Sequence, residues 1–445
     1  MPLDEIFKAY DIRGTYPDQI DEDATRRIGN AFARFAKAQR IVVARDMRPS
    51  SIPLSEAFID GACAAGCDVI DIGLASTDLL YFASGALDAP GAMFTASHNP
   101  AQYNGIKLCR ERAGPVGEDT GLGEIRALAE QGAVEGPSRG SVSTREMLDD
   151  YATHVVGFVD PDALRPLVVV ADTANGMGGL VVPAVFERLP FELTVLFPEL
   201  DGTFPNHPAD PIQPENLEDL RRVVLEQGAD VGLAFDGDAD RVFLVDDEAR
   251  PLSGSLTTAM VAKGVLDQHP GETIVHNLIC SKAVPELVRE MGGTPVRTRV
   301  GHSFIKQVMA ETGAIFGGEH SGHYYFRENY RADSGLIAAV VVLEQLSRAG
   351  VPLSELRRPF DRYAASGEIN TRVDDPLAAL RAVEAAFEGC EIDRLDGLTI
   401  DAGDWWFNLR PSNTEPLLRL NLEAPDEQAC SARTQEVLAL IRGTG

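Results

Sequence analysis

The segment that follows the apolar run 231–235 alternates aspartates with small residues: Asp236-Gly237-Asp238-Ala239-Asp240-Arg241. Carboxylates this close repel one another strongly unless a cation lies among them. Oxygen ligands of this hardness suit Mg²⁺, whose other coordination positions go to water and phosphate oxygens. Calcium is the competing ion, but Asp247 and Glu248 do not complete the calcium-loop pattern. The spacing predicts a magnesium site, with a solvated acidic turn as the alternative.

A second segment places a serine where another apolar run ends: Thr95-Ala96-Ser97-His98-Asn99-Pro100. Because the proline prevents simple continuation of a strand, we expect Ser97 to lie exposed in a tight turn. A serine hydroxyl is a poor nucleophile unless a base or a cation assists it, and His98 and Lys107 are the local candidates. A turn stabilised by serine and asparagine side chains is the alternative interpretation.

Two further loops are rich in polar side chains. In the loop 317–323, Glu319 and Ser321 would point to one side of an extended backbone, a geometry suited to adjacent sugar hydroxyls. The loop 410–416 combines Arg410 with hydroxyl, amide and backbone donors, which is a common way to hold a terminal phosphate. A polar hairpin is the alternative for this loop. Together, the four loops indicate phosphoryl transfer to and from a sugar.

Composition limits the other function classes. The 445 residues include 68 aspartates and glutamates against 40 lysines and arginines, a formal charge of -28. This charge argues against nonspecific binding to nucleic acid or to an anionic membrane. A phosphate-bearing substrate therefore requires cations concentrated at its site, and lysines are scarce: Lys8, Lys37, Lys107, Lys263, Lys282 and Lys306.

Signals for export or membrane insertion are not evident in the sequence. The N-terminus lacks a basic region followed by an apolar run, and no uncharged stretch approaches the ~20 residues of a membrane span. Because no two pairs of cysteines have zinc-ribbon or redox spacing, we expect reduced core residues at positions 63, 67, 109, 280, 390 and 430. We predict a cytoplasmic protein.

Short β-branched runs alternate with helical patterns through most of the chain, which is the signature of an α/β fold. Three sets of strands are expected, at 41–44, 69–72 and 92–95, at 167–171, 193–197 and 231–235, and at 273–278, 296–300 and 314–316. The accompanying helices are expected at 55–65, 215–227, 283–290 and 304–311. The final pattern has strands at 366–373, 405–409 and 417–422, followed by a helix.

These sets divide the chain into four predicted domains, at 1–145, 146–250, 251–357 and 358–445. At ~100 to 200 residues per domain, the length favours three or four domains. We expect three α/β domains of similar design, a smaller C-terminal α+β domain, and a linker near 351–359.

The four loops occur in order together with two other segments, Tyr10-Asp11-Ile12-Arg13-Gly14 and Tyr103-Asn104-Gly105-Ile106-Lys107. In these segments the sequence closely resembles the α-D-phosphohexomutases over its full length, and within them the phosphomannomutase/phosphoglucomutase group. The resemblance implies that the three α/β domains have mixed sheets and that all four domains surround a central cleft. It also implies a phosphotransferase that interconverts hexose 1-phosphate and hexose 6-phosphate of mannose, glucose or both.

The resemblance further implies the cofactors and the residue roles. Ser97 would be a phosphoserine that binds Mg²⁺ together with Asp236, Asp238 and Asp240, and hexose 1,6-bisphosphate would be the intermediate and activator. The residues around the phosphoserine would be Arg13, His98, Lys107 and Arg241. Glu319 and Ser321 would bind the sugar 3- and 4-hydroxyls, and the nonreacting phosphate would be held by Arg410, Ser412, Asn413 and Thr414. Further cleft residues would be Tyr10, Lys282 and His302, with His323 or Lys107 in proton transfer.

Three alternatives remain open at this point. Phosphoglucosamine mutase uses the same chemistry, but Asn413 stands where that group typically has glycine, and His320 where it often has glutamine. A nucleotide-dependent dehydrogenase is disfavoured because Val181 stands where the third glycine of the dinucleotide fingerprint belongs. A noncatalytic sugar-phosphate sensor could use the same cleft. The sequence leaves the preferred sugar open, and the chain is expected to be a monomer or a homodimer.

Overall fold

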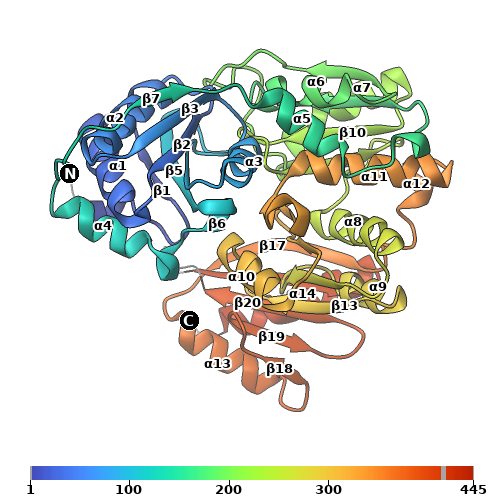
Figure 1. Cartoon of the computed structure of the whole chain (residues 1–445). Helices are drawn as coiled ribbons and strands as arrows, with labels where there is room; N and C mark the ends of the chain where they lie inside the picture. The colour runs from blue at the N-terminus through green and yellow to red at the C-terminus, as the bar shows by residue number, and fades with distance from the viewer. Residues whose placement is uncertain (1–2, 412–416, 444–445) are drawn as a thin grey trace.

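Four β-sheets, each formed by one continuous stretch of the chain, make up the protein. The computed structural model describes residues 3–411 and 417–443. Figure 1 shows the sheets following one another in sequence order around the molecule, with the C-terminal domain at the bottom.

The first sheet has the strand order β1-β5-β4-β2-β3-β7, with β6 paired to β5. Parallel pairs in its centre and antiparallel pairs at β5 make it a mixed sheet. Its strands are β1 (Ile12–Thr15), β2 (Arg40–Arg45), β3 (Asp68–Leu74), β4 (Gly91–Phe94), β5 (Tyr103–Arg110), β6 (Gly114–Pro115) and β7 (Val142–Thr144). Its helices are α1 (Glu22–Ala36), α2 (Ser51–Ala64), α3 (Thr77–Leu87) and α4 (Leu122–Glu130).

The second and third sheets are also mixed. The second has the order β11-β10-β8-β9 and contains β8 (Val168–Asp172), β9 (Glu192–Leu196), β10 (Val231–Phe235) and β11 (Val242–Asp246). Its helices are α5 (Leu148–Val156), α6 (Gly178–Phe186) and α7 (Glu218–Gln227). The third has the order β13-β12-β14-β15-β16 and contains β12 (Thr273–Asn277), β13 (Thr294–Thr298), β14 (Phe316–Gly318), β15 (Tyr324–Phe326) and β16 (Ala332–Asp333). Its helices are α8 (Gly254–Gln268), α9 (Ala283–Glu290), α10 (His302–Thr312), α11 (Gly335–Ala349) and α12 (Leu353–Leu356).

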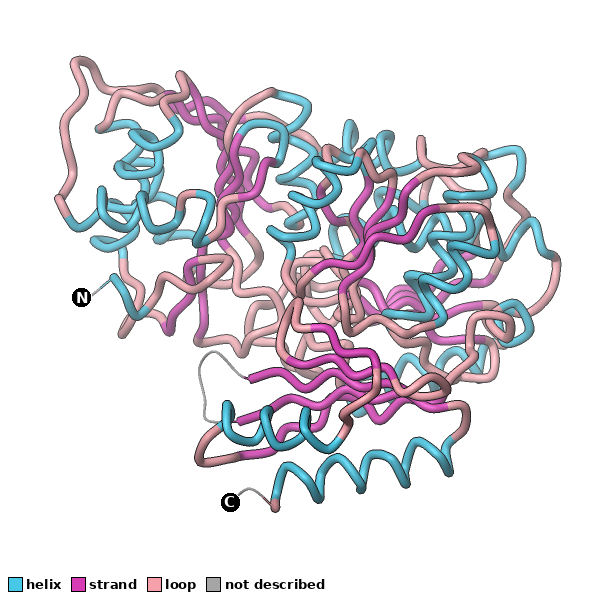
Figure 2. The backbone as a smooth tube through the Cα atoms, turned by 90° about the horizontal axis from the view of Figure 1, so that it is seen from below, coloured by secondary structure: helices cyan, strands magenta, loops and turns pink. Residues whose placement is uncertain are grey.

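The fourth sheet is antiparallel, with the order β17-β21-β20-β19-β18. Its strands are β17 (Ala364–Arg372), β18 (Glu391–Asp393), β19 (Leu398–Asp401), β20 (Trp406–Pro411) and β21 (Leu417–Ala424). Helices α13 (Pro376–Ala386) and α14 (Glu427–Arg442) accompany it, and Figure 2 shows both on the same side of the strands.

The predicted fold class is confirmed: three α/β domains with mixed sheets and a smaller C-terminal α+β domain. Each strand predicted from the sequence overlaps an observed strand. The limits at 145, 250 and 357 stay predictions, although every sheet falls within one of the four predicted segments. No helix in the described part of the chain is long and apolar enough to cross a membrane.

The expected linker near 351–359 is wrong, because this segment is packed. It contains α12, whose Leu353 joins the largest apolar cluster, and Ser354 N–H donates to Asp247 Oδ1 at 2.7 Å. Arg357 Nη1 donates to the buried Asp246 at 3.0 Å. The change of pattern near residue 358 suggested a linker, but Ser354 and Arg357 hydrogen-bond to the second domain.

One apolar cluster joins the first three domains, whereas the C-terminal domain has its own. The shared cluster includes Leu80 from α3, Val169 from β8 and Leu336 from α11. Residues 335–343 of helix α11 are apolar on every side and nearly the whole helix is buried, as expected for a helix in the interior. The C-terminal cluster contains residues between Ala379 and Ile441 only.

A buried hydrogen-bond network crosses the same three domains at Asp78. This carboxylate, on α3, accepts from the hydroxyl groups of Ser76, Tyr151 of α5 and Ser334, the N-cap of α11; the Ser334 bond measures 2.7 Å. Burial raises the pKa of Asp78 to about 6, although the three hydroxyl donors act to lower it. One side chain thus serves donors from three domains.

Replacing Asp78 with alanine leaves three buried hydroxyl groups without their acceptor. We expect Asp78→Ala to lower the free energy of unfolding by about 3 kcal/mol, measured by urea unfolding with circular dichroism. The difference from wild type should be larger below pH ~6 than above it, because a raised carboxyl pKa stabilises the folded state in acid. The control, Asp267→Ala, removes an exposed carboxylate paired with Lys263 and should cost at most about 0.5 kcal/mol. Equal losses in the two variants would contradict the network.

Candidate active site

Ser97 lies just after β4, in the turn that leads to β5. The expectation of an exposed turn is wrong: Ser97 is only 6% exposed, because side chains and loops of other segments cover it. Its backbone is left-handed, with φ of 50°, which is uncommon for a residue other than glycine. Such strain persists only where surrounding contacts hold it, and Ser97 N–H donates to Thr95 Oγ1 at 3.0 Å.

Arg48 stabilises the turn that contains Ser97 by hydrogen-bonding to its backbone. Its side chain is fully buried, and Asp46 Oδ2 accepts from its Nε at 3.1 Å. The remaining guanidinium nitrogens donate to four backbone carbonyls: Ser97 at 2.9 Å, Asn99 at 2.7 Å, Pro100 at 2.9 Å and Tyr103 at 3.0 Å. A planar fork of donors suits several acceptors spread around one position, which the point charge of a lysine does not.

The acidic loop connects β10 to β11 and meets Ser97 directly. Ser97 Oγ donates to Asp236 Oδ2 at 2.7 Å. Arg241 Nε donates to the same oxygen at 2.9 Å, and Arg241 Nη2 lies 3.2 Å from Ser97 Oγ. Gly237 permits this approach, because a Cβ there would lie 2.4 Å from the Ser97 carbonyl oxygen. The structure therefore brings together the predicted serine and the first predicted metal ligand.

The three aspartates form one buried group. Asp236, Asp238 and Asp240 each offer an oxygen within 4.8 Å of the others. Lys107 Nζ donates to Asp238 Oδ2 at 2.7 Å and to Asp240 Oδ2 at 2.6 Å. The other oxygens of these two carboxylates, both Oδ1, have no hydrogen-bond partner among the described residues. Unpaired buried carboxylate oxygens suit a hard divalent cation, so the group is able to hold a metal ion.

The ionisation of this group is set by burial and by Lys107. Burial raises the pKa of Asp236 to about 7 and that of Asp240 to about 7, against the opposing effect of the nearby cations. Burial acts in the same direction on Asp238, but Lys107 lowers the pKa of Asp238 below its usual range. Burial alone would lower the pKa of Lys107, but the two carboxylates raise it well above its usual value. Lys107 is therefore charged.

His98 and Arg13 border the serine, as predicted. His98 Nδ1 lies 3.3 Å from Ser97 Oγ and 2.6 Å from Arg241 Nη2. Burial, assisted by Arg241 and Arg13, lowers the pKa of His98 to about 3, so its imidazole is neutral. Arg13 Nη1 donates to Asn99 Oδ1 at 2.6 Å, which connects β1 to the serine turn.

The third loop joins β14 to β15 as a tight turn, in which Gly322 N–H donates to the Glu319 carbonyl at 3.1 Å. The premise of an extended backbone that would align Glu319 and Ser321 is therefore wrong. Ser321 Oγ lies 3.0 Å from Nδ1 of His323. The buried carboxylate of Glu319 accepts hydrogen bonds from three donors, Tyr325, Asn277 and Gly301.

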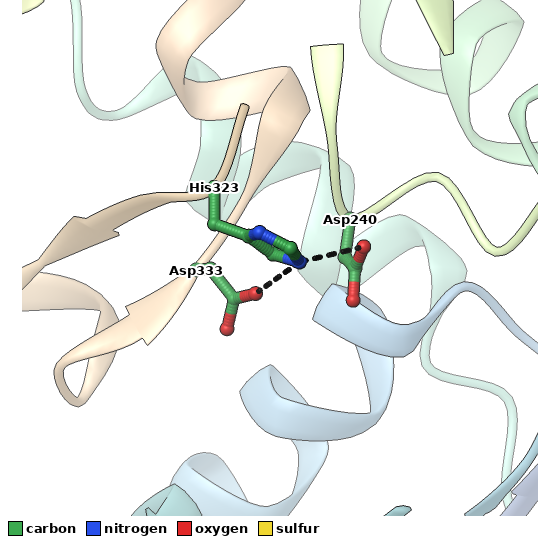
Figure 3. A group of neighbouring side chains, drawn as sticks. All are labelled: Asp240, His323 and Asp333. Atoms are coloured by element: carbon green, nitrogen blue, oxygen red, sulfur yellow. Dashed lines mark ion pairs between the residues drawn. The ribbon is translucent and has the colours of Figure 1, made fainter. Parts of the chain in front are cut away.

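His323 faces the acidic loop from the third domain. Its Nε2 lies 3.8 Å from Asp240 Oδ1 and 3.9 Å from Asp333 Oδ2 (Figure 3). Burial, together with Arg241 and Lys107, lowers the pKa of His323 well below its usual value. The structure thus brings His323 to the same carboxylate that Lys107 contacts.

Tyr10 and His302 lie together where the first and third domains meet. Their ring centroids are 5.3 Å apart, and the Tyr10 hydroxyl donates to the Val300 carbonyl at 3.1 Å. Gly301 has φ of 131°, and a Cβ there would lie 2.7 Å from the Tyr10 hydroxyl oxygen, so glycine is required. Burial lowers the pKa of His302 to about 3.

Arg410 lies on β20 of the C-terminal sheet, and Lys282, just before α9, contacts the same sheet from the third domain. Lys282 Nζ donates to Asp401 Oδ2 at 3.1 Å and borders a cavity of about 380 Å³ between the third and fourth domains. Arg410 Nη1 lies 3.6 Å from Asp396 Oδ2. Within residues 3–411 and 417–443, neither side chain hydrogen-bonds to Ser97 or to the three aspartates. The other predicted phosphate-binding residues lie outside the described residues: Ser412, Asn413 and Thr414.

Sequence reasoning missed several residues of this site. Besides Arg48 and Asp46, Thr77 Oγ1 donates to Asp238 Oδ2 at 2.5 Å, and Asp333 lies beside His323. The positions of Arg48, Asp46 and Thr77 relative to the predicted strands could have indicated that they belong to the site. Strands β2, β3 and β4 are parallel, so their carboxyl ends meet at one edge of the sheet, where ligands bind in such folds. Asp46 and Arg48 follow β2, and Thr77 follows β3.

Comparison with known proteins agrees with this geometry. Four family models match, described as phosphoglucomutase/phosphomannomutase alpha/beta/alpha domains I, II and III, at residues 4–134, 149–249 and 253–363, and C-terminal domain, at 368–440. The chain is 43% identical over 443 residues to a protein named phosphohexose mutases from Xanthomonas campestris pv. campestris, covering 98% of this chain and 99% of that one.

Two further relatives agree. A phosphomannomutase of Salmonella montevideo is 43% identical over 450 residues, which cover 98% of each chain. The crystal structure of a phosphoglucomutase/phosphomannomutase family protein from Burkholderia thailandensis superposes with a TM-score of 0.90 at 33% identity, covering 99% of this chain and 98% of that one. These matches confirm the resemblance seen in the sequence. The chain belongs to the phosphoglucomutase/phosphomannomutase family, and it is a hexose phosphate mutase.

Proposed function

We propose that Ser97 carries the phosphoryl group that this mutase moves between O1 and O6 of mannose and glucose phosphates. The observation that carries the proposal is the 2.7 Å hydrogen bond from Ser97 Oγ to Asp236 Oδ2 inside a buried group of carboxylates and cations. One oxygen of Asp238 and one of Asp240 have no hydrogen-bond partner among the described residues. A purely structural role for Ser97 would not explain why these buried oxygens are unpaired.

The reaction has two steps: the phosphoryl group moves from Ser97 to the sugar in the first and from the sugar to Ser97 in the second. In the first, the P–O bond to Ser97 breaks and phosphorus bonds to the 6-hydroxyl oxygen of a hexose 1-phosphate; the hydroxyl proton passes to a base, and Ser97 Oγ gains a proton. The resulting hexose 1,6-bisphosphate reorients in the cleft. In the second, the phosphoryl group at O1 returns to Ser97, hexose 6-phosphate leaves, and the serine is phosphorylated again.

The protein stabilises the charge that develops on the transferred group. Arg241 Nη2 lies 3.2 Å from Ser97 Oγ, and Arg13 reaches the same turn through Asn99. Preorganised cations of this kind supply most of the catalysis in phosphoryl transfer. The two groups proposed for proton transfer, Lys107 and His323, both face Asp240, at 2.6 Å from Oδ2 and 3.8 Å from Oδ1.

Three aspartates and the phosphoserine are proposed to hold Mg²⁺. The ligands would be Asp236, Asp238, Asp240 and an oxygen on Ser97, and the two unpaired Oδ1 atoms support this assignment. When bound, the ion would stabilise negative charge on the transferred phosphoryl group.

Substrate recognition is proposed for the third and fourth loops. Because either end of the sugar must be accepted, the protein must bind hydroxyls that stay equivalent after reorientation, and the 3- and 4-hydroxyls meet this requirement. Glu319 and Ser321 are their proposed partners, and Glu319 has capacity for another donor beyond the three it accepts. The nonreacting phosphate is assigned to Arg410, Ser412, Asn413 and Thr414, and further cleft contacts to Tyr10, Lys282 and His302. A cytoplasmic location and a monomeric or dimeric state stay predictions.

Ser97→Ala should abolish the relay. We expect kcat to fall by at least about 10⁴-fold, the scale seen when a covalent nucleophile is removed, and the intact mass to lack a phosphoryl group. The matched control is Ser55→Ala, which removes a buried hydroxyl inside α2 and should keep both activity and phosphorylation. Near-normal turnover in Ser97→Ala would remove the serine from the mechanism. A phosphoryl group on Ser97 of the wild type, visible in the intact mass, would favour the enzyme over the sensor.

Metal binding should be measurable without turnover. Mg²⁺ at 100 times its dissociation constant should stabilise the metal-free protein by about 2.7 kcal/mol, seen as a higher Tm and as heat in calorimetry. In Asp238→Asn both responses should disappear, while the exposed-site control Asp267→Asn keeps them. An unchanged Mg²⁺ response in Asp238→Asn would refute the assigned ligands.

Mannose and glucose phosphates should both be substrates, because these sugars differ at C2 and share configuration at C3 and C4. Coupled assays with glucose 1-phosphate and mannose 1-phosphate, with hexose 1,6-bisphosphate present, should give kcat/KM values within about a thousandfold of each other, or about 4 kcal/mol. A larger ratio would show that C2 is recognised. Glucosamine 1-phosphate in the same assay tests the phosphoglucosamine mutase alternative.

A further inference from the structure

Five neighbouring side chains form a chain, with two lysines at its ends, two aspartates next to them and the imidazole of His323 in the middle. In order they are Lys107, Asp240, His323, Asp333 and Lys306. His323 Nε2 stands between two carboxylates, 3.8 Å from Asp240 Oδ1 and 3.9 Å from Asp333 Oδ2, as Figure 3 shows. Each carboxylate turns its other oxygen toward a lysine, at 2.6 Å for Asp240 with Lys107 and at 3.8 Å for Asp333 with Lys306.

Asp333 is a buried group that the proposed mechanism does not use. It ends the edge strand β16, where it pairs with Tyr325, and it is 3% exposed. Its Oδ1 has no hydrogen-bond partner among the described residues. A buried carboxylate in this condition is costly unless a neighbouring charge compensates for it. The charge present is the ammonium of Lys306.

Lys306 is itself held in place from another domain. It belongs to α10, is 3% exposed, and its Nζ lies 3.9 Å from the centre of the Tyr81 ring of α3. An aromatic face attracts a desolvated ammonium ion. The first domain thus fixes Lys306, and Lys306 fixes Asp333.

The group Asp240, His323 and Asp333 has the donors for a metal ion, but positive charge is already present at both carboxylates. Lys107 and Lys306 lie at their outer oxygens, so a second divalent cation would meet two ammonium groups. The inner oxygens both face one imidazole nitrogen (Figure 3). This arrangement orients a histidine rather than assembling a second metal site.

We propose that Asp333, supported by Lys306, is a positioning residue that fixes the imidazole of His323. The inference rests on the proposed proton-transfer role of His323. Ser321 Oγ, 3.0 Å from Nδ1, and Asp240 each constrain the ring, and Asp333 adds a second carboxylate at Nε2 that limits its rotation further. Asp333 acts through His323, so its loss should reduce kcat and leave KM nearly unchanged.

A double-mutant cycle tests the proposal, because residues that act as a unit are not additive. Asp333→Asn should lower kcat by about 10- to 100-fold, the scale of a small misplacement of a catalytic group, with KM within about twofold of wild type. In the His323→Ala background, Asp333→Asn should lower kcat by no more than about twofold further. The histidine NMR signal of the wild type that is missing in His323→Ala should shift in Asp333→Asn.

Controls separate positioning from stability. Glu344→Gln neutralises another buried carboxylate, paired with Arg348, away from the site and should keep kcat. In Asp333→Asn/Lys306→Met the buried ammonium is also removed, so Tm should recover while kcat stays low.

Two outcomes would overturn the proposal in different ways. Equal losses of kcat from Asp333→Asn in both backgrounds, or an unshifted His323 signal, would show that Asp333 does not act through His323. Near-normal kcat in His323→Ala would instead refute the proposed proton transfer, and with it the need for positioning, while leaving the phosphoserine relay intact.

Discussion

Ser97 hydrogen-bonds to Asp236 inside a group of three buried carboxylates. Each buried carboxylate would lower the stability of the folded protein by several kcal/mol if no positive charge compensated for it. Compensation comes from different domains. Lys107 belongs to β5 of the first sheet and Arg241 to the loop after β10 of the second. None of these domains could bury its own part of the site alone. The carboxylates and the cations that neutralise them therefore come together only when the domains pack against one another.

Apolar packing holds the first three domains together, but among the described residues it does not join the fourth domain to them. The first three share one core through α11, and the Asp78 network adds polar contacts across the same boundary. The C-terminal domain has a separate core and meets the third domain through polar pairs such as Lys282 with Asp401 and Arg297 with Asp393. Polar pairs exchange with water at low cost. The C-terminal domain is therefore joined to the other three less firmly than they are joined to one another.

The chemistry of the site was predictable from the sequence because it depends on local order. The Asp236 loop is recognised by alternating aspartates after an apolar run, and the Ser97 loop by a serine shortly before a proline. Neither pattern depends on which segments pack over the loop. The burial of Ser97 was not predictable, since it is produced by segments more than a hundred residues away. Asp333 escaped notice because β16 has only two residues and carries no periodic pattern. The segment 351–359 was mistaken for a linker because its partners, Asp246 and Asp247, lie in another domain.

The scarcity of lysine has a physical meaning within this site. On a surface of charge -28, exposed charges act over roughly 8 to 10 Å at physiological salt, so they scarcely affect a ligand inside the cleft. Buried cations are screened far less; Lys306 is buried, and the side chain of Lys107 is only 12% exposed. In the proposed mechanism, a bisphosphate intermediate that left the cleft would leave Ser97 without its phosphoryl group. An interior that attracts phosphate, enclosed by an exterior that repels it, favours reorientation of the intermediate over its escape and rebinding.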